Sequence, residues 1–303
     1  MNQKMKSLYK EYPWLKITTT IKEYVAPEYY NRLLKDYTFD GKKDTQFFEE
    51  FLKSVHSNEI INALELGCGS GRATKVFIDS LKTKEFKLEL VDLSKRMLDF
   101  SQKKFRNRKN LEFFESDSIA FLEKTSEVYD IIFSFWSFSH SVHQILIKKG
   151  YGEGKMYIQK VIRKVIKENM KRSSKFFLIH FDSLSEEQKI LMKQWNKVFP
   201  IYNNLDSQSP SKLLITEVLE ELCKEGLIKL RSNYFEGDAI TYLSTNEALE
   251  VFLNFHMESY FNENSLLPDI IGELENYFRK FTDKDGRIKI KPGCFIYEVE
   301  RNG

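Results

Sequence analysis

Three glycines at alternate positions follow a short apolar stretch, and they are the residues best suited to hold a nucleotide-like ligand. They are Gly67, Gly69 and Gly71, and the apolar stretch ends at Leu66. Because glycine has no Cβ, it adopts positive φ readily and lets a ligand lie against the backbone. The helix formers from Arg72 onward predict a helix whose first amides point free N–H groups at a bound anion. The stretch therefore predicts a strand, a tight turn and a helix that bind a ligand together.

Acidic residues at the ends of the predicted strands supply groups that could hold the polar parts of such a ligand. Glu65 stands just before the first glycine, and Asp117 ends a later apolar stretch. Asp92 ends the stretch between them, about 20 residues after the last glycine, where a carboxylate would accept hydrogen bonds from a pair of ribose hydroxyls. The Gly-x-Gly-x-Gly spacing differs from that of dinucleotide sites, and no P-loop lysine follows. Other nucleotide-binding α/β domains remain an alternative at this point.

The segment Glu65-Leu-Gly-Cys-Gly-Ser-Gly71, with Asp92 and Asp117 closing the next two strands, resembles the class I S-adenosylmethionine-dependent methyltransferases. The resemblance covers roughly residues 45–185. It implies S-adenosylmethionine as the cofactor, with Glu65 near its ammonium group, Asp92 on the ribose and Asp117 with Ser118 on the adenine, whose ring Leu93 and Ile119 would cover. The cofactor-binding residues that it implies are Glu65, Gly67, Gly69, Gly71, Asp92, Leu93, Asp117, Ser118 and Phe135.

Strands alternate with helices between residues 43 and 185, which predicts an α/β fold with a doubly wound parallel sheet as the cofactor-binding core. The predicted strands are 60–66, 87–92, 111–117, 129–140 and 175–182. Ligands of such sheets bind beyond the carboxyl ends of the strands, where the strand order reverses. This rule adds the segment from Trp136 to His140, and Asp182, to the candidate site.

The flanking segments are predicted to complete the sheet and to cover the site. Residues 1–42 predict a helical lid, and residues 186–303 predict the remaining strands, 228–244 with a turn near Gly237 and 293–300, with a helical substrate cap at about 246–281 between them. The resemblance then implies a mostly parallel seven-stranded sheet with an antiparallel last strand. This architecture loosely resembles small-molecule methyltransferases of the histamine N-methyltransferase and trans-aconitate methyltransferase kind.

Histidines and aromatic residues are the candidates for the substrate end of the site. Methyl transfer needs a base only if the accepting atom must lose a proton, and histidine titrates nearest neutral pH. His140 and His143 are the candidate catalytic residues and His180 is a further candidate, although histidines in such places are more often structural or surface residues. The predicted substrate pocket consists of Tyr24, Tyr29, Tyr30, Trp136, His140 and His256.

Composition limits the partners and the setting of the protein. The chain of 303 residues has a formal charge of only +3, so no field that demands nucleic acid is expected, and no apolar run reaches the length of a membrane span. The three cysteines are far apart and form no Cys-x-x-Cys pair, so neither a disulfide framework nor a metal site is predicted. We expect a cytoplasmic protein that is a monomer or a homodimer.

The leading hypothesis is an enzyme that transfers a methyl group to nitrogen or oxygen of a small-molecule substrate. The Asp/Asn-Pro-Pro-Tyr signature of nucleic-acid amino methyltransferases is missing, and Ser134-Phe-Trp-Ser137 stands near its place. Two alternatives remain open at this stage. One is an RNA or protein methyltransferase, and the other is a non-catalytic subunit that keeps the cofactor fold.

Overall fold

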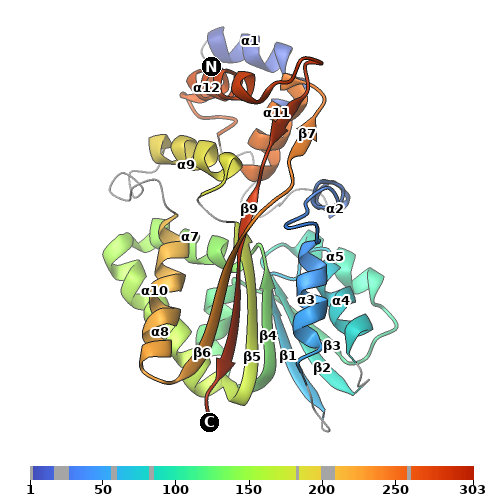
Figure 1. The fold of residues 1–303 in the computed structure, drawn as a ribbon, viewed down its shortest axis with the longest axis vertical. Coiled ribbons are helices and arrows are strands. Elements are labelled where there is room, and N and C mark those ends of the chain that lie inside the picture. The colour runs from blue at the N-terminus through green and yellow to red at the C-terminus, as the bar shows by residue number, and fades with distance from the viewer. Residues whose placement is uncertain are drawn as a thin grey trace.

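A seven-stranded, mostly parallel sheet forms the centre of the protein (Figure 1). The computed structural model describes residues 3–16, 27–55, 60–81, 85–181, 184–198, 209–257 and 261–303. The strands are β1 (Ile61–Leu66), β2 (Phe86–Asp92), β3 (Leu111–Glu115), β4 (Tyr129–Phe135), β5 (Met170–Phe181), β6 (Ile228–Glu236) and β9 (Gly293–Arg301). Their order is β3-β2-β1-β4-β5-β9-β6, and β9 runs antiparallel to both of its neighbours. The predicted α/β fold with an antiparallel last strand is therefore confirmed.

Helices cover both faces of the sheet because its strands bury apolar side chains on both sides. On β1, Ile61 and Ala63 join one hydrophobic core, whereas Leu64 and Leu66 join the other. Figure 1 shows α3 (Asp44–Leu52), α4 (Arg72–Ser80) and α5 (Lys95–Lys104) on one side, and α7 (Phe138–Lys149), α8 (Tyr151–Lys164) and α10 (Pro210–Lys224) on the other. The second core also contains α6 (Ser118–Lys124), and a π-helix, η2 (Val165–Asn169), joins α8 to β5. Strands buried on both faces are typical of parallel sheets.

A second layer lies above the carboxyl ends of the parallel strands (Figure 1). It contains α1 (Gln3–Glu11), η1 (Pro13–Lys16), α9 (Glu186–Val198), α11 (Thr245–Val251), η4 (Phe252–His256), α12 (Leu267–Phe278), η5 (Arg279–Phe281), and a two-stranded sheet of β7 (Ile240–Tyr242) and β8 (Ile288–Ile290). The Tyr9 hydroxyl donates to the Asn262 carbonyl at 2.7 Å, and the Tyr12 hydroxyl donates to Glu275 at 3.1 Å. The first helix is thus joined to the segment predicted as the cap, whereas α2 (Pro27–Leu34) lies nearer the sheet.

Two of the predicted strands end earlier than the sequence indicates. The stretch 228–244 leaves the seven-stranded sheet after Glu236. Its last residues form β7, which pairs with β8 in the separate two-stranded sheet. Gly237 marks the exit, since a Cβ there would lie 2.6 Å from Pro292 Cγ. The stretch 129–140 stops at Phe135, because Trp136 has a φ of 60° and its amide donates to the Ile179 carbonyl. Both corrections depend on contacts between segments far apart in the sequence. In the segments listed above, no helix combines the length and apolar character needed to cross a bilayer.

Candidate active site

A cavity of about 230 Å³ opens beyond the carboxyl ends of β1 to β5. Most of the predicted site residues line it, namely Tyr30, Gly67, Gly69, Asp92, Leu93, Asp117, Ser118, Phe135, Trp136, His140, His143 and His256. Glu65 and Gly71 lie outside its lining. Tyr24, Asp182 and the side chain of Tyr29 fall outside the described residues. The loops after β3, β2 and β1 form one end of the cavity, and the segments after β4 and β5 form the other.

The three glycines of the β1–α4 turn all adopt the left-handed conformation, but their surroundings differ. Their φ angles are 72° at Gly67, 52° at Gly69 and 68° at Gly71. A Cβ on Gly67 would lie 1.9 Å from Ser137 Oγ, and one on Gly71 would lie 2.5 Å from the Phe105 ring. A Cβ on Gly69 would meet no atom of the described residues within 4 Å. Gly67 and Gly71 therefore allow neighbouring side chains to pack closely against the turn, whereas Gly69, which lines the cavity, has open space at its Cβ position.

This difference predicts that two alanine substitutions act on different properties. Gly67→Ala should destabilise the fold by roughly 2–3 kcal/mol, because its positive φ costs about 1 kcal/mol and the collision of the new methyl group with Ser137 adds about 1–2 kcal/mol. Gly69→Ala should cost only about 1 kcal/mol of stability through its positive φ, yet weaken cofactor binding about tenfold, because it adds a methyl group to a residue that lines the cavity. Urea denaturation and calorimetric titration of the two variants check this. Equal losses of stability in both variants would contradict it.

Asp92 ties the glycine turn to the loop after β2. One carboxylate oxygen, Oδ2, accepts the Gly69 amide at 2.7 Å, and Oδ1 accepts the Ser94 amide at 2.8 Å. The side chain is buried. Burial raises the pKa of Asp92, and the two amide hydrogen bonds partly oppose that rise. Asp92 thus holds the shape of the turn and also presents a carboxylate to the cavity.

Glu65 lies beneath the glycine turn rather than in the cavity. Its carboxylate accepts a hydrogen bond from Thr74 Oγ1 on α4 at 2.5 Å, and the side chain is fully buried. Burial raises the pKa of Glu65 to about 8, and the negative charge of Asp92 acts in the same direction. In this structure Glu65 supports the base of the turn through α4.

The raised pKa of Glu65 predicts a pH dependence of stability. A carboxyl group whose pKa is raised on folding binds its proton more tightly in the folded state, so its contribution is fully present below the unfolded pKa. That contribution should be lost as the pH rises through about 8. We expect the melting temperature to fall from pH 7 to pH 9 in the wild type and to fall less in Glu65→Gln, because this range lies above the pH at which histidines of the unfolded chain titrate. If the melting temperature of Glu65→Gln fell with pH as steeply as that of the wild type, the prediction would be contradicted. Glu168→Gln, at an exposed position, is the control and should behave as the wild type does.

The predicted adenine end of the site contains a capped helix and an exposed apolar side chain. Asp117 Oδ1 accepts the amides of Ile119 and Ala120 at 2.9 and 3.0 Å and so caps α6. Leu93 is 39% exposed, which suits a side chain that a planar ligand would cover. Ile119 is fully buried in the core beneath α6, so the expectation that it covers a ring is wrong. A cofactor ring would contact Leu93 on this side.

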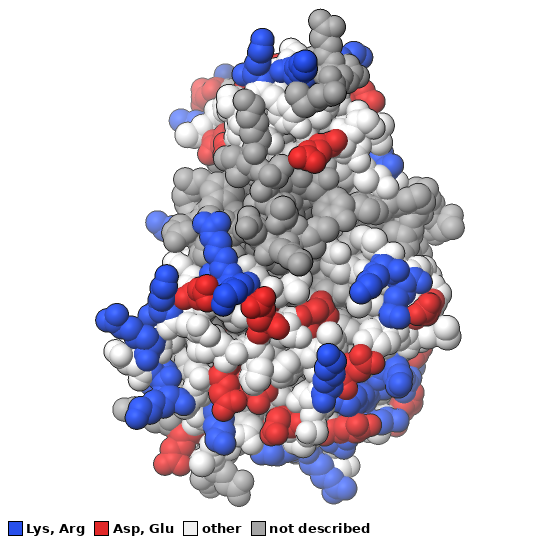
Figure 2. Space-filling model, turned by 180° about the vertical axis from the view of Figure 1, so that it is seen from behind, with Lys and Arg blue, Asp and Glu red and all other residues white. Residues whose placement is uncertain are grey.

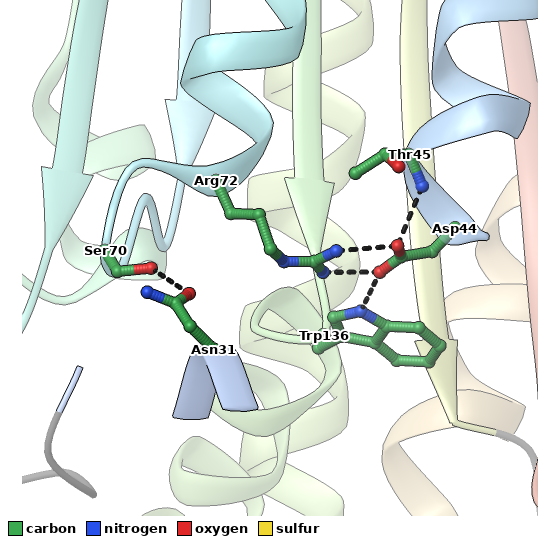
Figure 3. Close-up of polar contacts among 6 residues, drawn as sticks. All are labelled: Asn31, Asp44, Thr45, Ser70, Arg72 and Trp136. Atoms are coloured by element: carbon green, nitrogen blue, oxygen red, sulfur yellow. Dashed lines mark hydrogen bonds and ion pairs between the residues drawn. The ribbon is translucent and has the colours of Figure 1, made fainter. Parts of the chain in front are cut away.

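A buried ion pair that the sequence analysis missed connects α3, α4 and the end of β4 (Figure 3). The Arg72 guanidinium donates to both carboxylate oxygens of Asp44, with Nη1 to Oδ1 at 2.6 Å. Trp136 Nε1 donates to Asp44 Oδ2 at 2.7 Å, and the Thr45 amide donates to Oδ1 at 2.7 Å. Asp44 is therefore the common acceptor that fixes Arg72 beside the glycine turn and Trp136 in the cavity wall. Nearby, Ser70 donates to Asn31 of α2.

The histidines of the cavity differ in burial. His140 is half-buried, and its Nε2 lies 3.3 Å from Gln144 Nε2. Burial lowers the pKa of His143 and of His256 to about 3, so both are neutral at physiological pH. The fourth candidate, His180, is fully buried, stacks on Tyr297 with ring centroids 5.3 Å apart, and does not line the cavity. The expectation that His180 belongs to the site is therefore wrong.

Residues on α9 and around α3 complete the site, and sequence reasoning did not find them. Gln188 and Trp195 of α9 line the cavity, although the sequence analysis took only Asp182 from the region after the fifth strand. Extending the carboxyl-end rule to the next helix would have included both of them. The sequence gives no comparable indication of the ion pair of Asp44, because acidic residues are common in the first turn of helices for other reasons.

Residues 63–152 match the family model described as a methyltransferase domain. A search of curated proteins gives no match. Among solved structures the chain is similar to a putative methyltransferase (BH2331) from Bacillus halodurans C-125, with 13% identity, a TM-score of 0.49 and coverage of 86% of this chain and 99% of that one.

Two further structures are similar at comparable levels. One is a SAM-dependent methyltransferase from Thiobacillus denitrificans in complex with S-adenosyl-L-homocysteine, with 12% identity, a TM-score of 0.47 and coverage of 91% of this chain and 97% of that one. The other is the plantazolicin methyltransferase BpumL, with 13% identity, a TM-score of 0.45 and full coverage of both chains.

Proposed function

We propose that this chain, whose residues 63–152 match a methyltransferase domain, is a class I S-adenosylmethionine-dependent methyltransferase that transfers a methyl group to a nitrogen or oxygen atom of a small molecule. The cavity carries this proposal. It joins the loops after β1, β2 and β3, where the family binds its cofactor, to a second end walled by helices of the upper layer. A concave site beside a cofactor is typical of small-molecule enzymes.

The residues at the first end of the cavity fit S-adenosylmethionine. Gly69 leaves space where a ligand can lie against the backbone, and Asp92 presents a buried carboxylate suited to ribose hydroxyls. Asp117 and Ser118 line the wall where an adenine amino group would need polar partners, and Leu93 offers an apolar surface to the ring. When bound, this cofactor supplies a methyl group on a positively charged sulfur. Glu65 would act on it only indirectly, through the turn that it supports.

The chain's own task in methyl transfer is to align the acceptor and to exclude water. Holding two reactants in the right geometry is a large part of the rate, and a closed site strengthens its electrostatic interactions. For an acceptor that must lose a proton, we assign the removal to His140, whose half-buried ring lines the cavity. His143 lies one helical turn further along α7, and its pKa of about 3 makes it a weak proton acceptor.

The charge pattern of the surface supports a small-molecule substrate over nucleic acid. Figure 2 shows one face of the protein, on which Lys and Arg side chains are interspersed with Asp and Glu. A nucleic-acid site generally needs a basic patch or stripe. The basic residue Lys104, at the end of α5, is instead used within the fold, since its Nζ donates to the Ser70 and Gly71 carbonyls at 3.1 and 2.8 Å.

The proposal is tested by following the methyl group. The purified protein would be incubated with S-adenosylmethionine labelled at the methyl carbon and, in separate reactions, with a mixture of small amines, phenols and azoles, with total RNA, and with a protein extract. We expect label only in the small-molecule fraction. Label in RNA or protein alone would overturn the choice of substrate. Calorimetric binding of the cofactor without transfer in any reaction would favour a non-catalytic subunit.

A further inference from the structure

The substrate end of the cavity has aromatic walls. Tyr30 comes from α2, Trp136 from the end of β4, Trp195 from α9 and Phe255 from η4, and all four line the cavity. They derive from four elements that are far apart in the sequence. Aromatic side chains offer flat, polarisable faces, and ring pairs contribute about 0.5–1.5 kcal/mol beyond the area that they bury. Such walls favour a ligand that is itself flat and aromatic.

Each of these rings is held in place by a neighbour. Trp136 donates its indole N–H to Asp44. The Trp195 ring makes edge contacts with Phe261 at 4.9 Å and with His143 at 5.7 Å between centroids. A binding surface whose side chains are already fixed loses less entropy when a ligand binds. The two tryptophan rings are therefore pre-organised for a planar ligand.

The position of the Phe255 ring, which contacts Tyr30, depends on an irregular helix. Phe255 lies 5.6 Å from Tyr30 and 4.9 Å from His256, measured between ring centroids. Phe255 and His256 are the last two residues of η4, a π-helix that continues α11. The sequence predicts an ordinary helix here. π-Helical turns are rare and are found frequently at functional sites, where they redirect side chains. Both residues line the cavity from this turn.

Gln188 adds a hydrogen-bond acceptor of fixed orientation to these walls. Its Nε2 donates to Glu187 Oε1 at 3.3 Å, and Glu187 also accepts a hydrogen bond from the Tyr37 hydroxyl at 2.7 Å. Because the Gln188 nitrogen is the donor of this bond, the nitrogen side of the amide faces Glu187. The Gln188 carbonyl oxygen is then the part of the amide left for a ligand in the cavity that Gln188 lines.

We infer that the substrate of this methyltransferase is a planar aromatic heterocycle with an N–H or O–H group on its edge, bound among Tyr30, Trp136, Trp195 and Phe255 with that donor directed at Gln188. The inference rests on the proposed function only in taking this end of the cavity as the substrate site. It names the shape and the hydrogen-bonding character of the substrate, which the proposed function leaves open.

The test compares three lactams of nearly equal size. Oxindole is planar and has an N–H, octahydroindol-2-one has the same N–H on a saturated ring, and 1-methyloxindole is planar without the N–H. Binding to the full-length protein is followed by tryptophan fluorescence, since two of the three tryptophans of the chain line the cavity. We expect oxindole to bind about tenfold more tightly than the saturated lactam, as two ring contacts predict, and about fivefold more tightly than the methylated one.

Three variants and a control test whether the side chains that line the cavity cause the preference for oxindole. Trp195→Leu and Phe255→Leu should each reduce the preference for oxindole over the saturated lactam about threefold or more. Gln188→Met should remove the preference for oxindole over 1-methyloxindole. Trp14→Phe is the matched control, because Trp14 lies outside the cavity lining and donates to Asn246 of α11. Using two wall variants guards against one of them failing to fold.

The titrations are run with and without saturating S-adenosyl-L-homocysteine, whose own binding is measured by calorimetry. Failure of the homocysteine derivative to bind would count against the proposed function, while the lactam preference would still be measured on the protein alone. Equal binding of oxindole and the saturated lactam, no binding of either, or a preference that both wall variants leave unchanged would overturn the inference. A preference for oxindole that the wall variants reduce supports it.

Discussion

Replacing Asp44 with alanine should lower the free energy of unfolding by about 3 kcal/mol, the largest stability effect that the structure predicts. The substitution leaves the Arg72 guanidinium without its carboxylate, and it removes the acceptor of the Trp136 and Thr45 N–H groups. Removing one partner of a buried ion pair typically costs 3–5 kcal/mol, and the lower end applies because the Arg72 side chain is 24% exposed. Urea denaturation measures the loss.

A double-mutant cycle separates the ion pair from the other contacts of Asp44. Arg72→Met alone, and with Asp44→Ala, should show that the two residues are coupled by about 2 kcal/mol. Asp36→Asn is the control, because Asp36 is an exposed carboxylate after α2. A loss below about 0.5 kcal/mol in Asp44→Ala, the range of ordinary surface substitutions, would show that the pair adds nothing to stability.

Asp92→Ala should weaken the binding of S-adenosyl-L-homocysteine about 100-fold, equivalent to about 2.8 kcal/mol, the largest effect on binding that we expect. The variant loses the proposed partner of the ribose hydroxyls. It also leaves the Gly69 and Ser94 amides without their acceptor, so the glycine turn loses its fixed shape. Isothermal titration calorimetry on the folded variant gives the affinity directly.

A milder substitution and a control make the Asp92 prediction specific. Asp92→Asn keeps the size of the side chain but places an amide N–H₂ opposite one of the two backbone N–H groups, so it should lie between the wild type and Asp92→Ala. Glu115→Gln changes an exposed carboxylate at the end of the neighbouring strand and should bind as the wild type does. Unchanged affinity in Asp92→Ala would show that Asp92 does not contact the cofactor.

The end of the cavity that we propose for the cofactor was predictable because its residues are close in sequence and obey a general rule. Gly67 and Gly69 follow β1 and Asp92 ends β2, and the carboxyl ends of parallel strands meet at one edge of a sheet. The alternation of strands and helices then predicts the fold class as well. Patterns of this kind depend only on neighbouring residues, so the sequence alone is enough to predict the elements that they form.

The other end of the cavity, which we propose for the substrate, was predictable only in part. Trp136 and His140 follow β4 and were found by the same rule, and His256 was proposed from its place on the predicted cap. Gln188 and Trp195 were not found. Their helix carries no motif, and it reaches the cavity only because α9 lies over the carboxyl edge of the sheet (Figure 1). Contacts of that kind depend on the packing of the second layer.

The sequence by itself determined the sheet, its glycine turn and the acidic strand ends, because these follow from hydrophobic periodicity and from backbone angles that glycine adopts most readily. The tertiary structure alone decided the ion pair of Asp44 with Arg72, the positive φ of Trp136 and the exit of the chain at Gly237. Each of these joins segments that are distant in the chain. These three features are stabilised by contacts with residues that are distant in the sequence. No local sequence pattern predicts such contacts, so only the folded structure reveals them.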